Sequence, residues 1–375
     1  MKFSVDRDVL TDAVTWTARS LPNRPAVPVL AGVRLTAAEG TLTLSSFDYE
    51  VSAKCELPAQ IEQDGEALVL GKLLADICKS LPNRPVTLES DEQKVELTCG
   101  ASRFNLLTMP LEDYPALPQM PALAGTIEPA VFEEAVAQVT IAASRDDTLP
   151  LLTGVLMDID GEKLTLMATD RYRLALREMT WVPTDPEAQT TALVRARTLS
   201  DVAKSMTSGA DVQLSLDTTG EGSIVGFEAG GRHTTSQLVE GDYPKVRRLF
   251  PEACPTHAVV ETATLIEATK RVALVAERNA PVRLTFTDGE LALEAGQGEN
   301  AQASEAVQAT LVGEDIVTAY NPPYLLDGLS ALTAPYVRFS FTHPTKPAVL
   351  TGQETLDGEE DTSFRYLLMP IRVAV

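Results

Sequence analysis

The stretch LTLMATDRYRLALRE, residues 164–178, decides the fold because the chain contains it more than once. Its pattern predicts a strand, a polar break at Asp170–Arg173 and a second short strand. The upstream stretch LTLSSFDYEVSAKCE, residues 42–56, is identical to it at Leu, Thr, Leu, Asp, Ala and Glu, and LALEAGQGENAQASE, residues 291–305, repeats it more faintly. The copies begin 122 and 127 residues apart, which predicts three similar domains.

Two proline-rich segments separate these repeats. They are YPALPQMPALAG from Tyr114 and YPKVRRLFPEACP from Tyr243, and an Asp precedes the Tyr-Pro pair in both. A chain of 375 residues is also too long for one ordinary core. We therefore predict domains at residues 1–122, 123–250 and 251–375.

Each repeat contains two segments with apolar residues at the i, i+3, i+4, i+7 spacing of one helix face. In the first helices these residues are Leu10, Ala13, Val14 and Thr17, then Phe132, Ala135, Val136 and Val139, then Leu265, Ala268, Thr269 and Val272. In the second helices they are Leu74, Ile77, Cys78 and Leu81, then Leu199, Val202, Ala203 and Met206, then Leu325, Gly328, Leu329 and Leu332. Asp6 or Asp8 is expected to cap the first helix, and Gly40 to turn a hairpin. The prediction is an α+β fold with two helices packed on antiparallel sheets in each domain.

The composition is typical of a globular protein. Hydrophobic residues make up 44% of the chain, and no apolar run approaches the ~20 residues that span a bilayer. The first residues, MKFSVDRDVL, lack a basic segment followed by an apolar core. We expect no secretory signal, no membrane partner and a cytoplasmic location.

Cysteine and histidine usage argues against a metal site. The four cysteines show no CxxC pairing and are expected to be buried free thiols: Cys55, Cys78, Cys99 and Cys254. The three histidines are isolated and lack the spacing of metal ligands. We predict no metal and no cofactor.

The net charge of −22 is spread over all three predicted domains, and none of them is basic. Taken alone, this argues against nucleic-acid binding, because a strongly acidic protein repels phosphates at long range. The distribution of charge nevertheless decides what a phosphate meets within the Debye length of ~8–10 Å.

A row of three similar domains has free edges at both ends, and free edges favour aggregation unless they are paired. A head-to-tail dimer would pair the first domain of one chain with the third domain of the other. Such a dimer closes a ring of six domains.

Stretches along the whole chain carry a resemblance to a known family. They include SLPNRPAVPVLAGV at 20–33, LLADICKSLP at 73–82, SRFNLLTMPLEDYPALP at 102–118, ATDRYRLA at 168–175 and YLLMPIRV at 366–373. In this order and spacing they resemble the bacterial DNA sliding clamp, the β subunit of DNA polymerase III. The stretches SSFDYEVSA and RDDTLPLLTG are most similar to clamps of actinobacteria.

The resemblance implies a head-to-tail homodimer that closes a six-domain ring, with helices lining the hole and sheets forming the outer wall. Such a ring encircles duplex DNA, slides without sequence preference and tethers the replicative DNA polymerase as a processivity factor. The clamp loader and other proteins with clamp-binding motifs are the further partners that it implies.

The resemblance also implies that basic side chains face the DNA despite the acidic total. These are Arg24, Lys72, Lys79, Arg145, Arg197 and Lys204. In the third repeat, Ser330 stands at the position of Lys79, and Lys270 and Arg271 would compensate. The alternative is that these basic residues only solubilise exposed helix faces.

A hydrophobic pocket between the second and third domains is implied as the site that captures short linear peptides of partner proteins. Its residues are Leu152, Thr169, Arg171, Tyr172, Arg173, Leu174, Pro244, Leu249, Leu367, Met369, Pro370, Ile371 and Arg372. Arginine side chains at its rim would orient the peptide.

Many relatives have Gly-His in place of Arg171-Tyr172, so the entrance is expected to be bulkier and more basic here. Ala374 and Val375 extend past the usual terminus and would overhang the pocket or fray. Alternatively, these stretches are an ordinary turn and an ordinary final strand.

The ring interface is implied between the first and third domains. Phe104 and Leu106 on the last strands of the first domain would face Leu274 and Val275 on the first helix of the third domain. The alternative is that all four residues belong to the core.

Two rival functions remain open from the sequence. An enzyme could use the acidic pair Asp146 and Asp147, with Arg145 and Asp170 nearby, but no GxSxG, P-loop or metal spacing supports it, and GQGENA from Gly296 is a poor dinucleotide fingerprint. We therefore predict that the chain is not an enzyme. The second rival is a duplicate clamp variant that confers resistance to an inhibitor of the peptide pocket.

Overall fold

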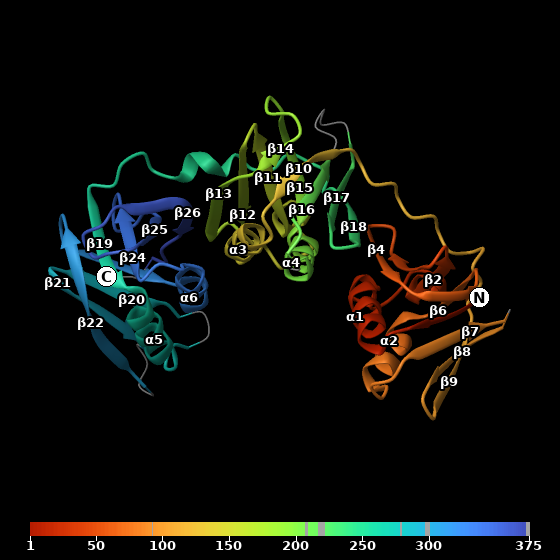
Figure 1. The fold of residues 1–375 in the computed structure, drawn as a ribbon. Coiled ribbons are helices and arrows are strands. Elements are labelled where there is room, and N and C mark those ends of the chain that lie inside the picture. The colour runs from red at the N-terminus through yellow and green to blue at the C-terminus, as the bar shows by residue number, and fades with distance from the viewer. Residues whose placement is uncertain (92, 207–208, 217–221, 278–279, 297–300, 373–375) are drawn as a thin grey trace. The chain divides into compact units, whose positions relative to one another are not determined.

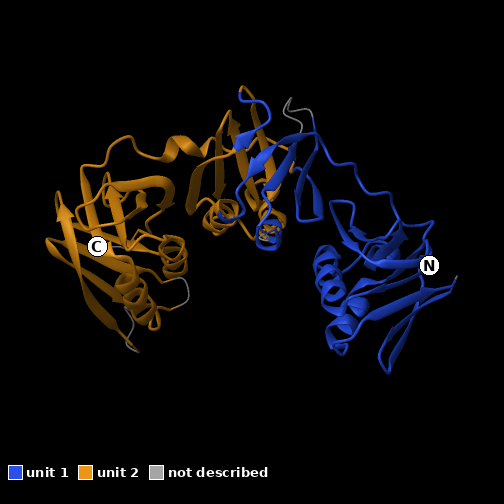
Figure 2. Ribbon diagram, viewed as in Figure 1, with its two compact units in different colours: residues 1–130, 182–186, 201–238 blue, residues 131–181, 187–200, 239–375 orange. Residues whose placement is uncertain are grey.

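The computed structural model describes residues 1–375 except 92, 207–208, 217–221, 278–279, 297–300 and 373–375. The described residues form six α-helices and three sheets, whose strand pairs are antiparallel (Figure 1). Contacts divide the chain into two compact units (Figure 2). Unit 1 contains residues 1–130, 182–186 and 201–238, and unit 2 contains residues 131–181, 187–200 and 239–375.

Unit 1 holds two sheets and the helices α1 (Arg7–Thr17) and α2 (Gly71–Ser80), which pack side by side (Figure 1). The five-stranded sheet has the order β5 (Gln60–Gln63), β1 (Lys2–Val5), β7 (Val86–Ser90), β8 (Lys94–Cys99), β9 (Ser102–Leu107). The nine-stranded sheet has the order β14 (Val182–Pro183), β10 (Leu123–Ile127), β16 (Val212–Leu216), β17 (Ile224–Ala229), β18 (Arg232–Gln237), β4 (Val51–Pro58), β3 (Thr41–Phe47), β2 (Gly32–Ala38), β6 (Gly65–Leu70).

Unit 2 holds one twelve-stranded sheet and the helices α5 (Thr262–Ala273) and α6 (Pro322–Ser330). The strand order is β15 (Gln189–Arg195), β11 (Gly154–Asp160), β12 (Lys163–Thr169), β13 (Arg173–Thr180), β26 (Glu360–Leu368), β25 (Ala348–Gln353), β24 (Tyr336–Phe341), β19 (Thr256–Glu261), β22 (Ala303–Val312), β21 (Gly289–Ala295), β20 (Val282–Thr287), β23 (Ile316–Tyr320). Helices α3 (Pro129–Thr140) and α4 (Ala196–Ser205) have residues in both units.

The predicted helix faces are confirmed, because every residue assigned to the six faces is buried. Asp6 is the cap of α1, and its Oδ1 accepts hydrogen bonds from the backbone amides of Asp8 at 2.8 Å and Val9 at 3.2 Å. The predicted hairpin turns at Glu39 and Gly40, which both have positive φ as a two-residue type I′ turn requires. Local sequence patterns therefore placed these elements correctly.

Two of the repeated stretches form matching hairpins. In β3–β4, Oδ1 of Asp48 accepts from the amides of Glu50 and Val51, and in β12–β13, Oδ1 of Asp170 accepts from the amides of Tyr172 and Arg173. The shared Asp thus closes the same turn in both copies. In the third copy, β21 pairs with β22, and the residues 297–300 between them lie outside the described residues.

The second strand of each of these hairpins pairs with a strand of the following repeat. We call the pairing of β4 with β18 the first seam, within unit 1, and the pairing of β13 with β26 the second seam, within unit 2. Because sheets continue across the seams, the two units do not follow the three sequence repeats. The predicted domain boundaries stay a prediction.

The described residues contain free thiols only. Cys55, Cys78 and Cys99 are buried as predicted, whereas Cys254 is half-buried. Burial raises the pKa of Cys78 to about 12. Over the same residues, His, Cys, Asp and Glu side chains form no group of three or more that could hold a metal ion, and no helix is long and apolar enough to cross a membrane.

Candidate functional site

The second seam carries a pair of leucines where the first seam carries a polar pair. Leu174 lies opposite Leu367 in the second seam, and Ser52 lies opposite Thr235 at the same place in the first. The hydroxyls of Ser52 and Thr235 are buried and 2.5 Å apart, so they satisfy each other. Only the second seam is therefore apolar at this position.

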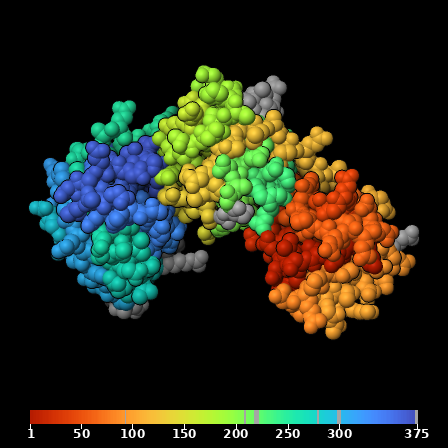
Figure 3. Space-filling view, in the orientation of Figure 1, coloured from red at the N-terminus to blue at the C-terminus, as the bar shows by residue number. Residues whose placement is uncertain are grey.

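Leu174 and Leu367 belong to a buried apolar cluster built from strands and from the connection between repeats. Its buried members are Met167, Leu174, Leu176, Val246, Val349 and Leu367, and Leu156, Tyr243 and Phe250 pack against it. In the space-filling view the C-terminal residues adjoin those of the second repeat (Figure 3), as the pairing of β26 with β13 requires.

The connection at residues 243–250 forms one border of this cluster. The hydroxyl of Tyr243 accepts a hydrogen bond from the backbone amide of Thr169 at 3.0 Å, and burial raises the pKa of Tyr243. In the short helix Val246–Leu249, Val246 is buried but Leu249 is 54% exposed, and Pro244 is also exposed. The connection thus leaves an apolar side chain available at the surface.

The C-terminal segment forms a second border. The amide of Met369 donates to the carbonyl of Tyr172 at 2.9 Å, and the amide of Ile371 donates to the carbonyl of Ala319 at 2.8 Å. Met369 is 42% exposed, Pro370 and Ile371 are half-buried, and Arg372 is exposed. Ala374 and Val375 lie outside the described residues.

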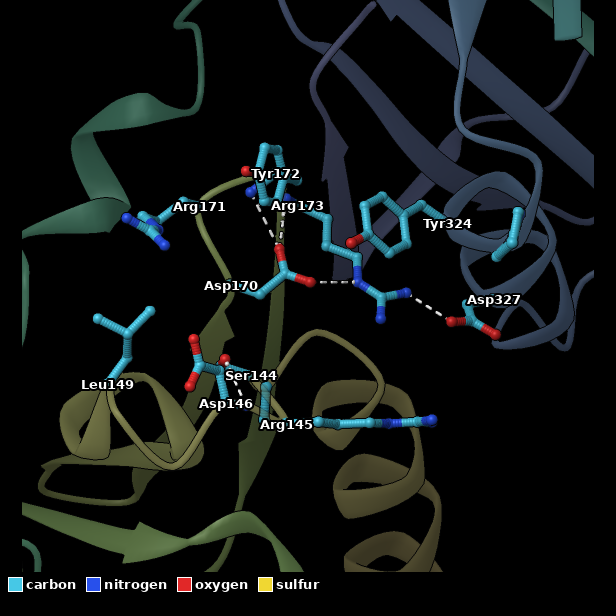
Figure 4. A pocket seen from close by; sticks show the side chains of 12 residues that line it. Ser144, Arg145, Asp146, Leu149, Asp170, Arg171, Tyr172, Arg173, Tyr324 and Asp327 are labelled. Carbon is cyan, nitrogen blue, oxygen red and sulfur yellow. Dashed lines mark hydrogen bonds and ion pairs between the residues drawn. The ribbon is translucent and has the colours of Figure 1, made fainter. Parts of the chain in front are cut away.

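Arg173 is the buried centre of a polar network beside the apolar cluster (Figure 4). Its Nε donates to Asp170 at 2.9 Å and its Nη1 to Asp327 of α6 at 2.5 Å, while its guanidinium lies 4.3 Å from the ring centroid of Tyr324. Burial by itself would lower the pKa of Arg173, but Tyr366, Asp327 and Asp170 outweigh it and raise the pKa. Arg173 therefore fastens the turn of the second repeat to a helix of the third.

Tyr172 and Tyr324 cover this network. Their rings stack with centroids 6.1 Å apart and an interplanar angle of 27°. They border a polar pocket of about 550 Å³ between the loop at residues 143–149, the turn at residues 170–173 and the start of α6 (Figure 4).

The residues implied for the peptide pocket are divided between the surface and the core. Leu152, Thr169, Arg173, Leu174 and Leu367 are buried, and Arg171, Tyr172, Pro244, Leu249, Met369 and Arg372 are exposed. Arg171 is exposed, and its place at the rim stays a prediction. Arg173 does not lie at a rim, because it is 6% exposed and bound to two carboxylates. The sequence reasoning missed Tyr324, Asp327, Tyr243 and Val246. Only Tyr243 had a signal, because Asp-Tyr-Pro recurs after the first repeat.

Comparison with known proteins gives matches along nearly the whole chain. Three domains of the DNA polymerase III beta subunit match, namely the N-terminal domain at residues 1–118, the central domain at 126–245 and the C-terminal domain at 247–372. The chain belongs to the DNA polymerase III beta subunit family. It is therefore a sliding clamp with three clamp domains, the type of protein that makes a DNA polymerase processive.

Individual relatives agree with the family assignment. The beta sliding clamp of Streptomyces coelicolor is 56% identical over 375 residues, which cover 100% of both chains. The beta sliding clamp homolog GriR of Streptomyces muensis is 47% identical over 372 residues, 99% of both chains. The crystal structure of the Bacillus subtilis DNA polymerase sliding clamp has a TM-score of 0.92 at 26% identity and covers 100% of both chains. The resemblance to actinobacterial clamps is confirmed, since Streptomyces is an actinobacterial genus.

The six basic residues implied to face DNA are all exposed in the clamp chain. They are Arg24, Lys72, Lys79, Arg145, Arg197 and Lys204. Lys72 donates to the side-chain oxygen of Asn23 at 2.9 Å, and Lys79 lies 3.9 Å from Asp76. Lys270 and Arg271 form ion pairs with Glu267 and Glu305, and their compensating role in the third repeat stays a prediction. The contact with DNA stays a prediction.

The residues implied for the ring interface differ in exposure. Leu274 is 84% exposed, and Phe104 and Val275 are half-buried. Leu106 is only 3% exposed because it lies on the face of β9 that is turned to the core, while the next residue, Leu107, is 78% exposed. Because side chains alternate along β9, Leu107 and not Leu106 is accessible to a partner chain.

Two of the acidic residues considered for an enzyme, Asp146 and Asp170, accept hydrogen bonds within the fold. The hydroxyl and amide of Thr148 donate to Asp146, and these hydrogen bonds lower the pKa of its carboxyl. Asp170 accepts from two amides and from Arg173. A general acid at neutral pH needs a raised carboxyl pKa, so Asp146 does not suit that role. The glycine-rich GQGENA falls largely on residues 297–300, outside the described residues.

Proposed function

We propose that two copies of the chain associate head to tail into a closed ring that encircles duplex DNA and slides along it. The observation that carries this proposal is the match of three clamp domains over nearly the whole chain. A closed ring holds DNA by topology, so each phosphate contact can stay weak enough to permit sliding. This would explain why a chain with a net charge of −22 can work on DNA.

The ring interface and the contacts with DNA belong to the same proposal. Exposed Leu274 and Leu107 would form the contact between the first and third domains of two chains. Basic side chains such as Arg24, Lys72 and Lys204 would make the weak contacts with phosphates. Acting on the chromosome, the ring would work in the cytoplasm without catalytic activity of its own.

The second seam is proposed as the site that binds linear peptides of the replicative polymerase, the clamp loader and other partners. An apolar peptide side chain needs accessible apolar surface continuous with a packed base. Leu249 and Met369 would supply the surface, and Leu174 and Leu367 the base. The first seam lacks this base because Ser52 and Thr235 replace the leucines.

Retention on circular DNA tests the closed ring. The clamp would be loaded onto nicked circular plasmid by a bacterial clamp loader and separated from free protein by gel filtration. We expect the clamp to stay on the circle and to leave when a restriction enzyme linearises it. A clamp that dissociates equally from circular and linear DNA would contradict the proposal.

The duplicate clamp that resists an inhibitor is the second candidate. The chain is 56% identical to the Streptomyces coelicolor clamp and 47% identical to the homolog GriR, which favours the ordinary clamp. Processive synthesis with the replicative polymerase from the same cell distinguishes the two. With an ordinary clamp, an inhibitor of the peptide pocket stops processive synthesis. With a resistant duplicate, processive synthesis continues in the presence of the inhibitor.

A further inference from the structure

Arg171 occupies a backbone conformation that its side chain makes unfavourable. Its φ of 81° lies in the left-handed region, where the Cβ of any residue except Gly is crowded. Such conformations persist where the surrounding structure enforces them, and they gather at binding sites. The side chain at this position therefore needs an explanation.

At the matching position of the first seam, the packing of the side chain explains the left-handed conformation. Tyr49 has a φ of 73°, and its ring packs edge-on against Phe47 with centroids 5.6 Å apart. The backbone amide of Arg171 donates to Oγ1 of Thr169 at 3.2 Å, but its exposed guanidinium forms no hydrogen bond or ion pair with a described residue. One copy of the turn uses its left-handed residue for packing against a neighbouring ring, whereas the other presents a guanidinium that no described side chain binds directly.

No described carboxylate forms an ion pair with the guanidinium of Arg171, although its charge helps the hydrogen bonds of Thr148 to lower the pKa of Asp146. Arg173 is neutralised by Asp170 and Asp327, and one oxygen of Asp146 is held by Thr148. In Figure 4, Arg171 extends away from Asp170, whereas Arg173 reaches towards it. Arg171 lines the polar pocket beside the stacked rings of Tyr172 and Tyr324.

Chain continuity connects this guanidinium to the proposed peptide site. The next residue, Tyr172, holds Met369 through its carbonyl, and Leu174 begins the apolar base three residues later. A peptide that places apolar side chains on Leu249 and Met369 would bring a flanking residue to the turn. The planar guanidinium matches a carboxylate with two parallel hydrogen bonds.

We propose that Arg171 determines peptide specificity by binding the carboxylate of an Asp or Glu residue that flanks the apolar residues of the bound peptide. The proposal rests on the proposed peptide site in the second seam. A phosphate of DNA is the competing anion, and the experiment separates the two.

The test uses the full-length clamp and two fluorescent peptides with a bacterial clamp-binding motif. The peptides are identical except that one carries Asp and the other Asn beside the apolar residues. The wild-type clamp is expected to bind the Asp peptide about three- to five-fold more tightly, as an exposed ion pair allows, and the preference should shrink in high salt. Arg171→Gly should bind both peptides equally, and it should fold normally because Gly accepts the left-handed φ.

Matched variants sharpen the result. Tyr49→Gly changes the equivalent residue of the first seam and should keep the wild-type preference, whereas Arg171→Lys should keep part of it. An Asp preference that survives in Arg171→Gly overturns the proposal. The ratio of the Kd values for the Asn and Asp peptides could also be the same in the wild-type clamp and in Arg171→Gly. If Arg171→Gly is then retained less well on circular DNA, Arg171 binds a phosphate and the proposal is overturned. If neither peptide binds the wild-type clamp, the peptide site itself fails and the proposal falls with it.

Discussion

The two seams have the same backbone and different interiors. Both begin at a turn closed by an Asp, and both place equivalent residues opposite each other on paired strands. The first seam buries a hydrogen-bonded pair of hydroxyls, while the second buries two leucines within a larger apolar cluster. The comparison teaches that a repeated hairpin supplies the scaffold, and that a few side-chain exchanges convert one copy into a candidate binding site.

The segments that border the two hairpins differ as well. After the first repeat, Tyr114 is buried against Val29, Phe47 and Leu68. After the second repeat, Tyr243 takes the equivalent place, but Leu249 and Met369 stay partly exposed. The second seam therefore combines a packed apolar base with an accessible apolar surface.

The largest expected effect comes from moving the polar pair into the second seam. Leu174→Ser combined with Leu367→Thr removes two fully buried side chains from the apolar cluster. The free energy of unfolding should fall by about 4 kcal/mol, because the lost burial and the cavity outweigh one new hydrogen bond. Urea unfolding measures this, and a loss below about 1 kcal/mol would mean that the two seams are interchangeable.

Removing Arg173 should have the next largest effect. Arg173→Met leaves Asp170 and Asp327 without their shared cation, and we expect a loss of about 2–3 kcal/mol. Val51→Met, at the equivalent position of the first seam, is the matched control and should cost less than about 1 kcal/mol. The free energy of unfolding of both variants is measured by thermal and urea unfolding. Equal losses for Arg173→Met and Val51→Met would show that the network around Arg173 contributes nothing specific to stability.

The polar pair of the first seam should show a smaller and partly reversible effect. Ser52→Ala leaves the buried hydroxyl of Thr235 without its partner and should cost about 1–2 kcal/mol. Adding Thr235→Val removes the orphaned hydroxyl, so the double variant should be more stable than the single one. Additive losses in a double-mutant cycle would show that the two hydroxyls do not interact.

The sequence predicted those features that depend on local pattern. Apolar spacing placed all six helix faces, and the repeated Asp placed the turns at Asp48 and Asp170. These predictions succeeded because periodicity and turn chemistry act over a few residues.

The sequence could not show which side chains meet across the second seam. Asp327 and Tyr324 lie more than 150 residues from Arg173, and nothing in their local pattern marks them as its partners. Leu106 was placed at the ring interface by the resemblance alone, whereas the alternation of β9 turns Leu106 inward and Leu107 outward. A shift of one residue exchanges the two faces of a strand.

The central claim is that the second seam, and not the first, holds the peptide. Its most direct test is the Kd of a fluorescent clamp-motif peptide for full-length clamps with changes at exposed residues of each seam. Leu249→Ser with Met369→Ser should weaken binding at least about ten-fold, because both side chains are partly exposed beside the apolar cluster. Tyr49→Ser, at the exposed turn of the first seam, should leave the Kd unchanged. An unchanged Kd for the Leu249 and Met369 variant, or a comparable loss for Tyr49→Ser, would contradict the account.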